Sequence, residues 1–256
     1  MNIIVTASAF GSDKVIELGQ AYFIPIVAGA GGNGIEIRRE LFANQPFPLQ
    51  EIQNLIKQFQ LTAVYSAPET IWKEDGIVNQ IGLQNAIQEG ISIGSVLIKM
   101  PLGNYMPNDS DLQSLHQILR DYRLQDKGIQ FTVENDQTAC GGRIENLDRF
   151  LANCKSNNVP IKMTFDIGNW QWTGTNVFEA AGQMKEYVVY IHCKHVEENY
   201  GKHHTVPLPS SRDAAWRKLL AILPTDIPRA IEFPLEGNDF TGTAAKYIQL
   251  LQEETK

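Results

Sequence analysis

The chain has 256 residues, of which 43% are hydrophobic and 20% are charged. This is the composition of an ordinary globular protein with enough apolar residues for a large core. The formal net charge of -7 argues against a nucleic-acid partner, because an acidic chain on average repels phosphate groups. The three cysteines, Cys140, Cys154 and Cys193, form no C-x-x-C pair, which argues against a disulfide framework or a cysteine-rich zinc site.

The first residues, "MNIIVTASAF", lack the basic segment and long apolar run of a signal peptide. No apolar stretch approaches the ~18 residues that a membrane-spanning helix needs. We therefore expect a cytoplasmic protein without a membrane partner.

Short β-branched runs alternate along the chain with amphipathic segments. The runs predict eight strands, at residues 2–8, 34–38, 61–67, 95–100, 128–134, 161–167, 188–194 and 230–235. The amphipathic segments predict helices at 48–59, 110–124, 146–155, 176–187, 211–223 and 241–252. Ser110 is expected to cap the second of these helices, because serine is a favoured N-cap residue.

Each strand and helix pair spans roughly 30 residues, the size of a βαβ unit. Eight such units in this length predict an α/β protein, a (β/α)8 TIM barrel that forms a single domain over residues 1–256. A doubly wound open sheet is the main competitor. It usually has fewer strands, and the glycine-rich segment 28–34 leads into a strand and not into a helix, so we interpret it as a loop and not as a phosphate-binding turn.

The alternation of side chains along each strand predicts which residues enter the barrel. In four consecutive strands, apolar residues occupy the face that packs against the outer helices. The opposite face then directs four polar residues inward near the carboxyl ends of the strands: Glu134, Asp166, His192 and Glu232. Active sites of TIM barrels lie at these ends.

Three carboxylates in one barrel mouth would repel one another unless a cation neutralises them. Oxygen ligands with one imidazole suit Mn²⁺, Mg²⁺, Co²⁺ or Zn²⁺. The sequence therefore predicts a divalent metal site formed by Glu134, Asp166, His192 and Glu232. Taken alone, Asp166 or Glu232 could instead cap a following helix. Four inward-facing polar residues at the ends of four consecutive strands favour the metal site.

At these residues the chain resembles the xylose isomerase-like TIM barrels, the sugar isomerase and epimerase group. The resemblance covers nearly the whole chain. It includes "VEN" at Glu134, "FDIGN" at Asp166, "YIHCK" at His192, "IEFP" at Glu232 and "VPLPSSRDAAW", which ends at Trp216. The segments "RELF", "YSAPE", "ENDQT" and "CGGR" also resemble a narrower branch that is found with 2-ketogluconate use in bacteria.

Three positions depart from the family pattern. Asn169 stands where the family has a strand-six histidine, Tyr190 replaces the first histidine of H-x-H, and His195 stands where relatives often have an aspartate. These changes leave the four predicted ligands in place. They point to a substrate or a chemistry different from that of the sugar epimerases proper.

The resemblance implies an enzyme, a metal-dependent isomerase or epimerase of a ketose, sugar acid or sugar phosphate. Proton transfer would pass through a metal-bound enediolate, with Glu134 and Glu232 as the catalytic acid and base on opposite sides of one carbon. The partner would be a small-molecule sugar or sugar acid. Many relatives form dimers or tetramers, so the resemblance also implies a homo-oligomer.

Further residues are expected at the substrate. Arg38, Lys99 and Lys194 point toward the barrel mouth, where they either favour an anionic substrate or form ion pairs, Arg38 and Lys99 with Glu36 and Glu40. Asn169 is placed there by the family pattern. The segment "KHHTVP" at 202–207 is interpreted as a mobile loop from which His204 could reach the substrate.

Three alternative functions remain open. A sugar-acid or cyclitol dehydratase would use the same site and lose water from the product. A phosphodiesterase similar to endonuclease IV would need more metal-binding histidines and a basic DNA-binding face, whereas this acidic chain has five histidines. A non-catalytic sugar-binding barrel would not need the complete ligand set.

Overall fold

Eight parallel strands form a closed barrel in the computed structural model, which describes residues 2–255. Neighbouring strands around the barrel follow the order β1, β10, β7, β6, β5, β4, β3, β2. Their bounds are Ile3–Thr6 (β1), Gly34–Arg38 (β2), Thr62–Ser66 (β3), Leu97–Pro101 (β4), Gln130–Glu134 (β5), Ile161–Asp166 (β6), Val188–Cys193 (β7) and Arg229–Ile231 (β10). The predicted TIM barrel is confirmed.

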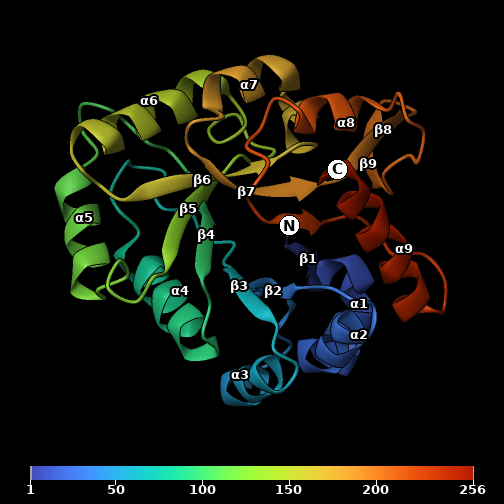
Figure 1. The fold of residues 1–256 in the computed structure, drawn as a ribbon. Helices are drawn as coiled ribbons and strands as arrows, with labels where there is room; N and C mark the ends of the chain where they lie inside the picture. Colours follow the sequence, from blue (N-terminus) through green and yellow to red (C-terminus); the bar gives the residue numbers. More distant parts are fainter. Residues whose placement is uncertain (1, 256) are drawn as a thin grey trace.

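Helices surround the strands on the outside of the barrel (Figure 1). Their bounds are Ser12–Leu18 (α1), Ile24–Gly29 (α2), Leu49–Gln58 (α3), Gln80–Ile93 (α4), Leu112–Asp121 (α5), Ile144–Ser156 (α6), Val177–Met184 (α7), Ala215–Leu220 (α8) and Phe240–Gln252 (α9). Short 3-10 helices follow β1, β2 and β6, at Ala7–Phe10 (η1), Arg39–Leu41 (η3) and Asn169–Thr173 (η4). Two more follow helices α1 and α9, at Gln20–Phe23 (η2) and Glu253–Thr255 (η5). The glycine-rich segment 28–34 leads into β2 as predicted, but its first two residues belong to α2 and its last residue to β2, so the loop is confined to residues 30–33.

The helix predictions need two corrections. The sequence did not predict α1, α2 or α4; α4 has two glycines, Gly82 and Gly90, and buried residues on much of its surface, so its amphipathic pattern is weak. The N-cap of α5 is Asp111 and not Ser110, because the Asp111 carboxylate accepts hydrogen bonds from the backbone N–H groups of Gln113 and Ser114.

Two separate apolar clusters show which way the strand residues point. The larger one lies between barrel and helices and includes Phe131, Val133 and Phe165, the residues predicted to face outward. The smaller one is formed by residues of the inner face, namely Ile4, Val64, Leu97, Tyr190 and Ala230. The inner cluster fills the barrel and leaves its carboxyl end to polar residues.

An antiparallel hairpin follows β7. It consists of β8 (His195–Asn199) and β9 (Lys202–Val206), with His195 opposite Val206 and Glu197 opposite His204. The prediction of a loop at 202–207 is therefore wrong for residues 202–206. The two histidines in this segment masked the strand pattern, and the pairing with β8 stabilises the extended conformation.

The last barrel strand is shorter than predicted. β10 ends at Ile231, so Glu232 follows the strand and does not belong to it. The backbone N–H of Glu232 still donates to the carbonyl of Cys193 at 3.0 Å, which keeps Glu232 in register with β7. Pro228 and Pro234 flank this segment and cannot donate backbone hydrogen bonds, which limits the ladder.

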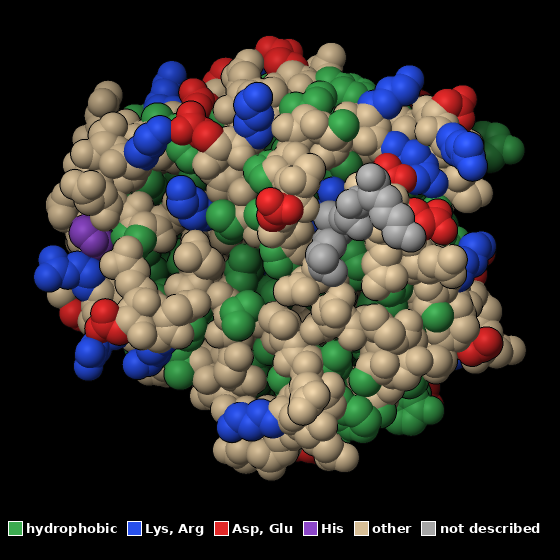
Figure 2. Space-filling model, in the orientation of Figure 1, with side chains coloured by type: hydrophobic (Ala, Val, Ile, Leu, Met, Phe, Trp, Pro, Cys, Tyr) green, Lys and Arg blue, Asp and Glu red, His purple; other side chains and the backbone are tan. Residues whose placement is uncertain are grey.

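Within residues 2–255, no helix combines the length and the apolar character that crossing a membrane requires. On the face seen in Figure 2, Lys and Arg side chains are interspersed with Asp and Glu and do not merge into one basic surface.

Candidate metal centre

The four predicted ligands lie together at the carboxyl end of the barrel. Glu134 ends β5, Asp166 ends β6, His192 belongs to β7, and Glu232 follows β10. Each offers one ligand atom, and these atoms all lie within 4.8 Å of one another. Residues separated by almost a hundred positions meet here because parallel strands of a barrel bring their carboxyl ends to one rim.

Carboxylate oxygens surround one nitrogen of His192. Nδ1 lies 2.8 Å from Glu134 Oε1, 3.1 Å from Glu232 Oε2 and 3.7 Å from Asp166 Oδ2. Within residues 2–255, His192 Nδ1 and Glu134 Oε1 are buried without a hydrogen-bond partner. Asp166 Oδ2 has no aligned donor either, although the Lys194 ammonium lies 2.7 Å away as an ion pair. Buried polar atoms without partners are rare, and three carboxylate oxygens with one imidazole nitrogen fit a divalent cation.

The other nitrogen of His192 contacts Glu36 in β2. His192 Nε2 lies 2.8 Å from Glu36 Oε2, and both side chains are fully buried. The hydroxyl of Tyr190 donates to the same Glu36 oxygen at 2.9 Å. An imidazole that donates from Nε2 to Glu36 presents the lone pair of Nδ1 to the centre, which is how carboxylates commonly orient metal-ligating histidines.

Asp166 is held by backbone groups and by Asn135. Its Oδ1 accepts hydrogen bonds from the backbone N–H groups of Gly168 at 2.7 Å and Asn169 at 2.8 Å. The Asn135 amide accepts from the backbone N–H of Asp166 at 2.8 Å and donates to its carbonyl at 3.0 Å. These contacts leave Asp166 Oδ2 directed toward the centre.

Three cations contact the carboxylates of the centre. Lys99 in β4 forms an ion pair with Glu134 Oε2. Arg38 in β2 donates to Glu232 Oε1 at 2.5 Å, and Lys194 lies 3.0 Å from Glu232 Oε2. The ion-pair alternative considered from the sequence is therefore observed: Arg38 also contacts Glu36 at 3.3 Å and Glu40 at 2.8 Å, and Lys99 lies 3.8 Å from Glu36.

The pKa shift of His192 indicates a negative potential at its ring. Burial lowers the pKa of His192, but Glu232, Glu36 and Glu134 outweigh burial and raise this pKa well above its ordinary value. Burial raises the pKa of Glu134, but Lys99 and His192 outweigh it and lower this pKa to about 2. Burial holds the pKa of Asp166 above its ordinary value even beside Lys194. A negative potential of this kind favours a bound cation.

A cavity of about 380 Å³ opens above the centre. Its lining includes Glu134, Glu232, Asn169 and the three cations Arg38, Lys99 and Lys194. Asn169 is the first residue of η4, where its amide donates to the carbonyl of Asn135 at 2.9 Å and accepts from Gln137 at 3.1 Å. A further cavity of about 230 Å³ shares Arg38, Lys194 and Glu232 and extends to Thr205 of β9. Together they form a polar space beside the predicted ligands.

The hairpin places its two histidines on opposite faces. His204 is exposed, and it is absent from the described lining of both cavities. His203 lies on the same face of β9 as Thr205, with its ring centroid 5.2 Å from that of Trp172. The structure thus brings His203, and not His204, toward the η4 side of the barrel mouth.

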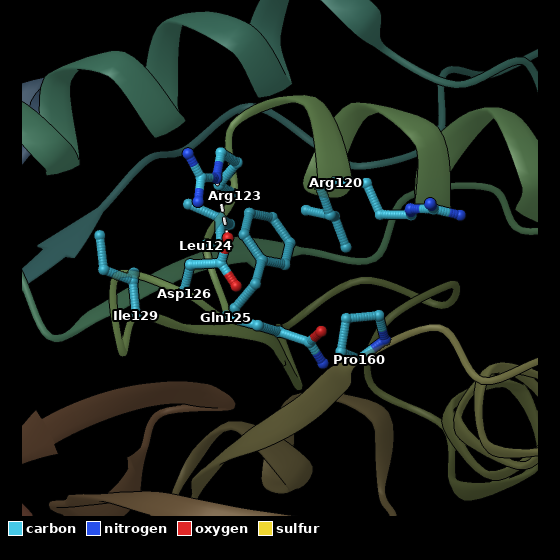
Figure 3. Close-up of a pocket in the computed structure, with 9 residues that line it drawn as sticks. Arg120, Arg123, Leu124, Gln125, Asp126, Ile129 and Pro160 are labelled. Carbon is cyan, nitrogen blue, oxygen red and sulfur yellow. Dashed lines mark hydrogen bonds and ion pairs between the residues drawn. The ribbon is translucent and has the colours of Figure 1, made fainter.

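A cavity of about 280 Å³ lies at the opposite end of the barrel, beside Ile129 and Pro160, which precede β5 and β6 (Figure 3). Its described lining contains one carboxylate, that of Asp126, which pairs with Arg123 at 2.8 Å. This cavity has no cluster of metal-binding side chains. The ligand cluster therefore marks the chemistry at the carboxyl end.

No local sequence pattern indicates that Glu36 contacts His192, or that Tyr190, Asn135 and Gln137 support the centre. The sequence predicts Glu36 only as an ion-pair partner of Arg38 or Lys99, whereas its contact with His192 of β7 crosses the barrel. Asn135 and Gln137 lie within the "ENDQT" segment that carried part of the resemblance.

The sequence matches no protein-family model, and a search of curated proteins finds no match. Solved structures do match. A xylose isomerase domain containing protein from Salmonella typhimurium LT2 superposes with a TM-score of 0.72 at 11% identity, over 99% of this chain and 97% of that chain. The chain shares the TIM-barrel fold of that protein.

Two other structures with this fold contain a ligand. Their similarity to this chain is comparable. The D-allulose 3-epimerase from Methylomonas sp., in complex with D-allulose, has a TM-score of 0.69 at 15% identity, over 97% of this chain and 96% of that chain. The IOLI protein with a binding zinc atom has a TM-score of 0.68 at 11% identity, over 100% and 96%. At such identities the likeness concerns the fold.

Proposed function

We propose that the chain is a divalent metal-dependent isomerase or epimerase of a ketose, sugar acid or sugar phosphate. The observation that carries this proposal is the convergence of Glu134, Asp166, His192 and Glu232 at the barrel mouth. The unpartnered atoms His192 Nδ1 and Glu134 Oε1 support a cation there. The folds of a D-allulose 3-epimerase and of a zinc-binding protein agree with the proposal.

The four ligand side chains would hold Mn²⁺, Mg²⁺, Co²⁺ or Zn²⁺. Such an ion polarises a substrate carbonyl and stabilises the negative charge that develops when a neighbouring carbon loses a proton. Glu134 and Glu232 are the proposed acid and base, because carboxylates held beside a carbon can take and return its proton. Lys99 fixes Glu134 and Arg38 fixes Glu232, so each glutamate has a defined orientation.

The cavity lining supports a polar substrate with anionic character. Arg38, Lys99 and Lys194 all line the cavity of about 380 Å³ and can approach a carboxylate or phosphate, while Asn169 offers an amide to hydroxyl groups. We retain a sugar acid or sugar phosphate as the favoured substrate class. The resemblance to the branch found with 2-ketogluconate use stays a prediction, and so does a homo-oligomeric state.

The proposal is tested by metal analysis and by exchange of a carbon-bound proton. Purified protein should contain about one divalent ion per chain, and Asp166→Ala should lose it. With a panel of ketoses, sugar acids and sugar phosphates in D₂O, the metal-loaded protein should introduce deuterium at one carbon. Glu134→Gln and Glu232→Gln should each abolish turnover while the protein remains folded.

Other outcomes distinguish the alternatives. A product that has lost one water identifies a dehydratase on the same site. Metal content without exchange or turnover on any sugar contradicts the isomerase proposal. A protein that binds no metal after incubation with Mn²⁺, Co²⁺, Zn²⁺ and Mg²⁺ contradicts the metal centre itself and favours a binding barrel.

A further inference from the structure

Lys194 differs from the other two cations at the centre in the oxygens that it contacts. Its ammonium lies 2.7 Å from Asp166 Oδ2 and 3.0 Å from Glu232 Oε2. Both oxygens also face His192 Nδ1, at 3.7 Å and 3.1 Å. They are thus the oxygens that the two carboxylates direct to the predicted cation.

The other two cations contact oxygens on the outside of the cluster. Lys99 pairs with Glu134 Oε2, whereas Glu134 Oε1 faces His192. Arg38 donates to Glu232 Oε1, whereas Glu232 Oε2 faces His192. Lys99 and Arg38 can therefore stay in place when a cation binds. Within residues 2–255, Lys194 is the one lysine or arginine paired with the oxygens of the inner side.

The chain leaves room for the Lys194 side chain in this position. A Cβ atom on Gly168 would lie 2.7 Å from Lys194 Cγ and 2.9 Å from Lys194 Cε, closer than such contacts occur. The absence of a side chain at Gly168 lets the stem of Lys194 pass over the turn after β6. Lys194 is 7% exposed and lines both cavities at the barrel mouth.

We propose that Lys194 is an internal competitor of the divalent cation, and that cation binding displaces its ammonium from Asp166 and Glu232 into the cavity. The inference rests on the proposed function, because it requires that a cation binds. Two positive charges that share the same oxygens in a buried site repel each other strongly. The displaced ammonium then faces the substrate space, so a substrate oxyanion meets Lys194 only when the cation is in place.

Calorimetric titration of Mn²⁺ into chelator-treated protein tests this inference directly. Lys194→Met keeps the length of the side chain and removes its charge. We expect it to bind Mn²⁺ about 10- to 100-fold more tightly than the unaltered protein, the range in which groups around metal ligands alter affinity. Lys202→Met, at an exposed position of β9, is the matched control and should leave the affinity unchanged.

Two further variants guard against a failure of Lys194→Met to fold. Lys194→Gln should also tighten Mn²⁺ binding, and Lys194→Arg should bind Mn²⁺ like the unaltered protein because it keeps the charge. Asp166 retains two backbone donors and Glu232 retains Arg38 in these variants, which favours folding. Equal or weaker Mn²⁺ affinity of the folded neutral variants overturns the inference.

The two proposals fail in different ways. If the unaltered protein and Lys194→Met bind Mn²⁺ with equal affinity, the inference is overturned while the metal centre stands. If neither binds any divalent ion, both are overturned. Tighter Mn²⁺ binding by Lys194→Met, without turnover of any sugar by the unaltered protein, supports the inference and contradicts the isomerase activity.

Discussion

Replacing Glu36 by Gln should weaken both the fold and the metal centre. Glu36 is fully buried, and its Oε2 contacts Tyr190 Oη at 2.9 Å and His192 Nε2 at 2.8 Å. Its Oε1 lies 3.3 Å from Arg38 Nη1 and 3.8 Å from Lys99 Nζ. A glutamine offers only one carbonyl oxygen to the four groups on Tyr190, His192, Arg38 and Lys99. Its amide N–H groups would face either the first two or the last two of these groups, which are themselves donors.

The expected magnitudes follow from these contacts. Removing one partner of a buried ion pair costs roughly 3–5 kcal/mol, because the remaining charge is left without compensation. We therefore expect the free energy of unfolding of the metal-free protein to fall by about 3–5 kcal/mol in Glu36→Gln. Loss of the acceptor that orients His192 should lower the Mn²⁺ affinity by about 10- to 100-fold.

Urea unfolding and calorimetric Mn²⁺ titration measure the two effects. Glu40→Gln is the matched control, since the Glu40 side chain is 35% exposed and pairs with the same Arg38 at 2.8 Å. It should change the free energy of unfolding by no more than about 1 kcal/mol. If Glu36→Gln matches this control in stability and binds Mn²⁺ like the unaltered protein, Glu36 does not hold His192 and the reasoning is wrong.

Three further predictions concern single positions. The pKa of Glu134 is about 2 in the folded protein, against 4.5 in the unfolded chain. This difference stabilises the metal-free protein by about 3 kcal/mol at pH values above 4.5. The urea midpoint should therefore fall as the pH drops from 4.5 toward 2, and it should fall less steeply in Glu134→Gln. If the proposed activity holds, His204→Ala should leave KM within about twofold of the unaltered protein, since His204 is exposed; a large rise in KM means that the hairpin moves. Gly168→Ala should lower kcat/KM because its Cβ displaces Lys194; unchanged kinetics show that the stem adapts.

The barrel and the four central side chains could be predicted because both depend on strand alternation. The period of two fixes which face a residue occupies, and the parallel order of strands fixes the end at which it lies. Glu134, Asp166 and His192 each follow this rule within a strand. Glu232 lies one residue beyond β10 but keeps the register through its backbone hydrogen bond to Cys193.

Other features depend on contacts that no local pattern contains. The approach of Glu36 to His192 joins residues 156 positions apart, and it follows from the closure of the barrel and not from either strand. The hairpin is stabilised by the pairing of β9 with β8, from His195 opposite Val206 to Asn199 opposite Lys202, but its polar side chains resemble those of a loop. The sequence predicts that Lys194 lies near the barrel mouth. Which carboxylate oxygens its ammonium contacts depends on the space above Gly168.

The amide of Asn135 does for Asp166 what a neighbouring strand would do. It accepts from the Asp166 N–H and donates to the Asp166 carbonyl, so one side chain extends the β5–β6 ladder after the main chain of β5 has left the barrel. The segment beyond Asn135 is thereby released from holding Asp166 in register. Insertions and deletions between residues 136 and 143 can reshape the entrance of the cavity of about 380 Å³, and with it the choice of ligand, while the geometry beneath stays constant.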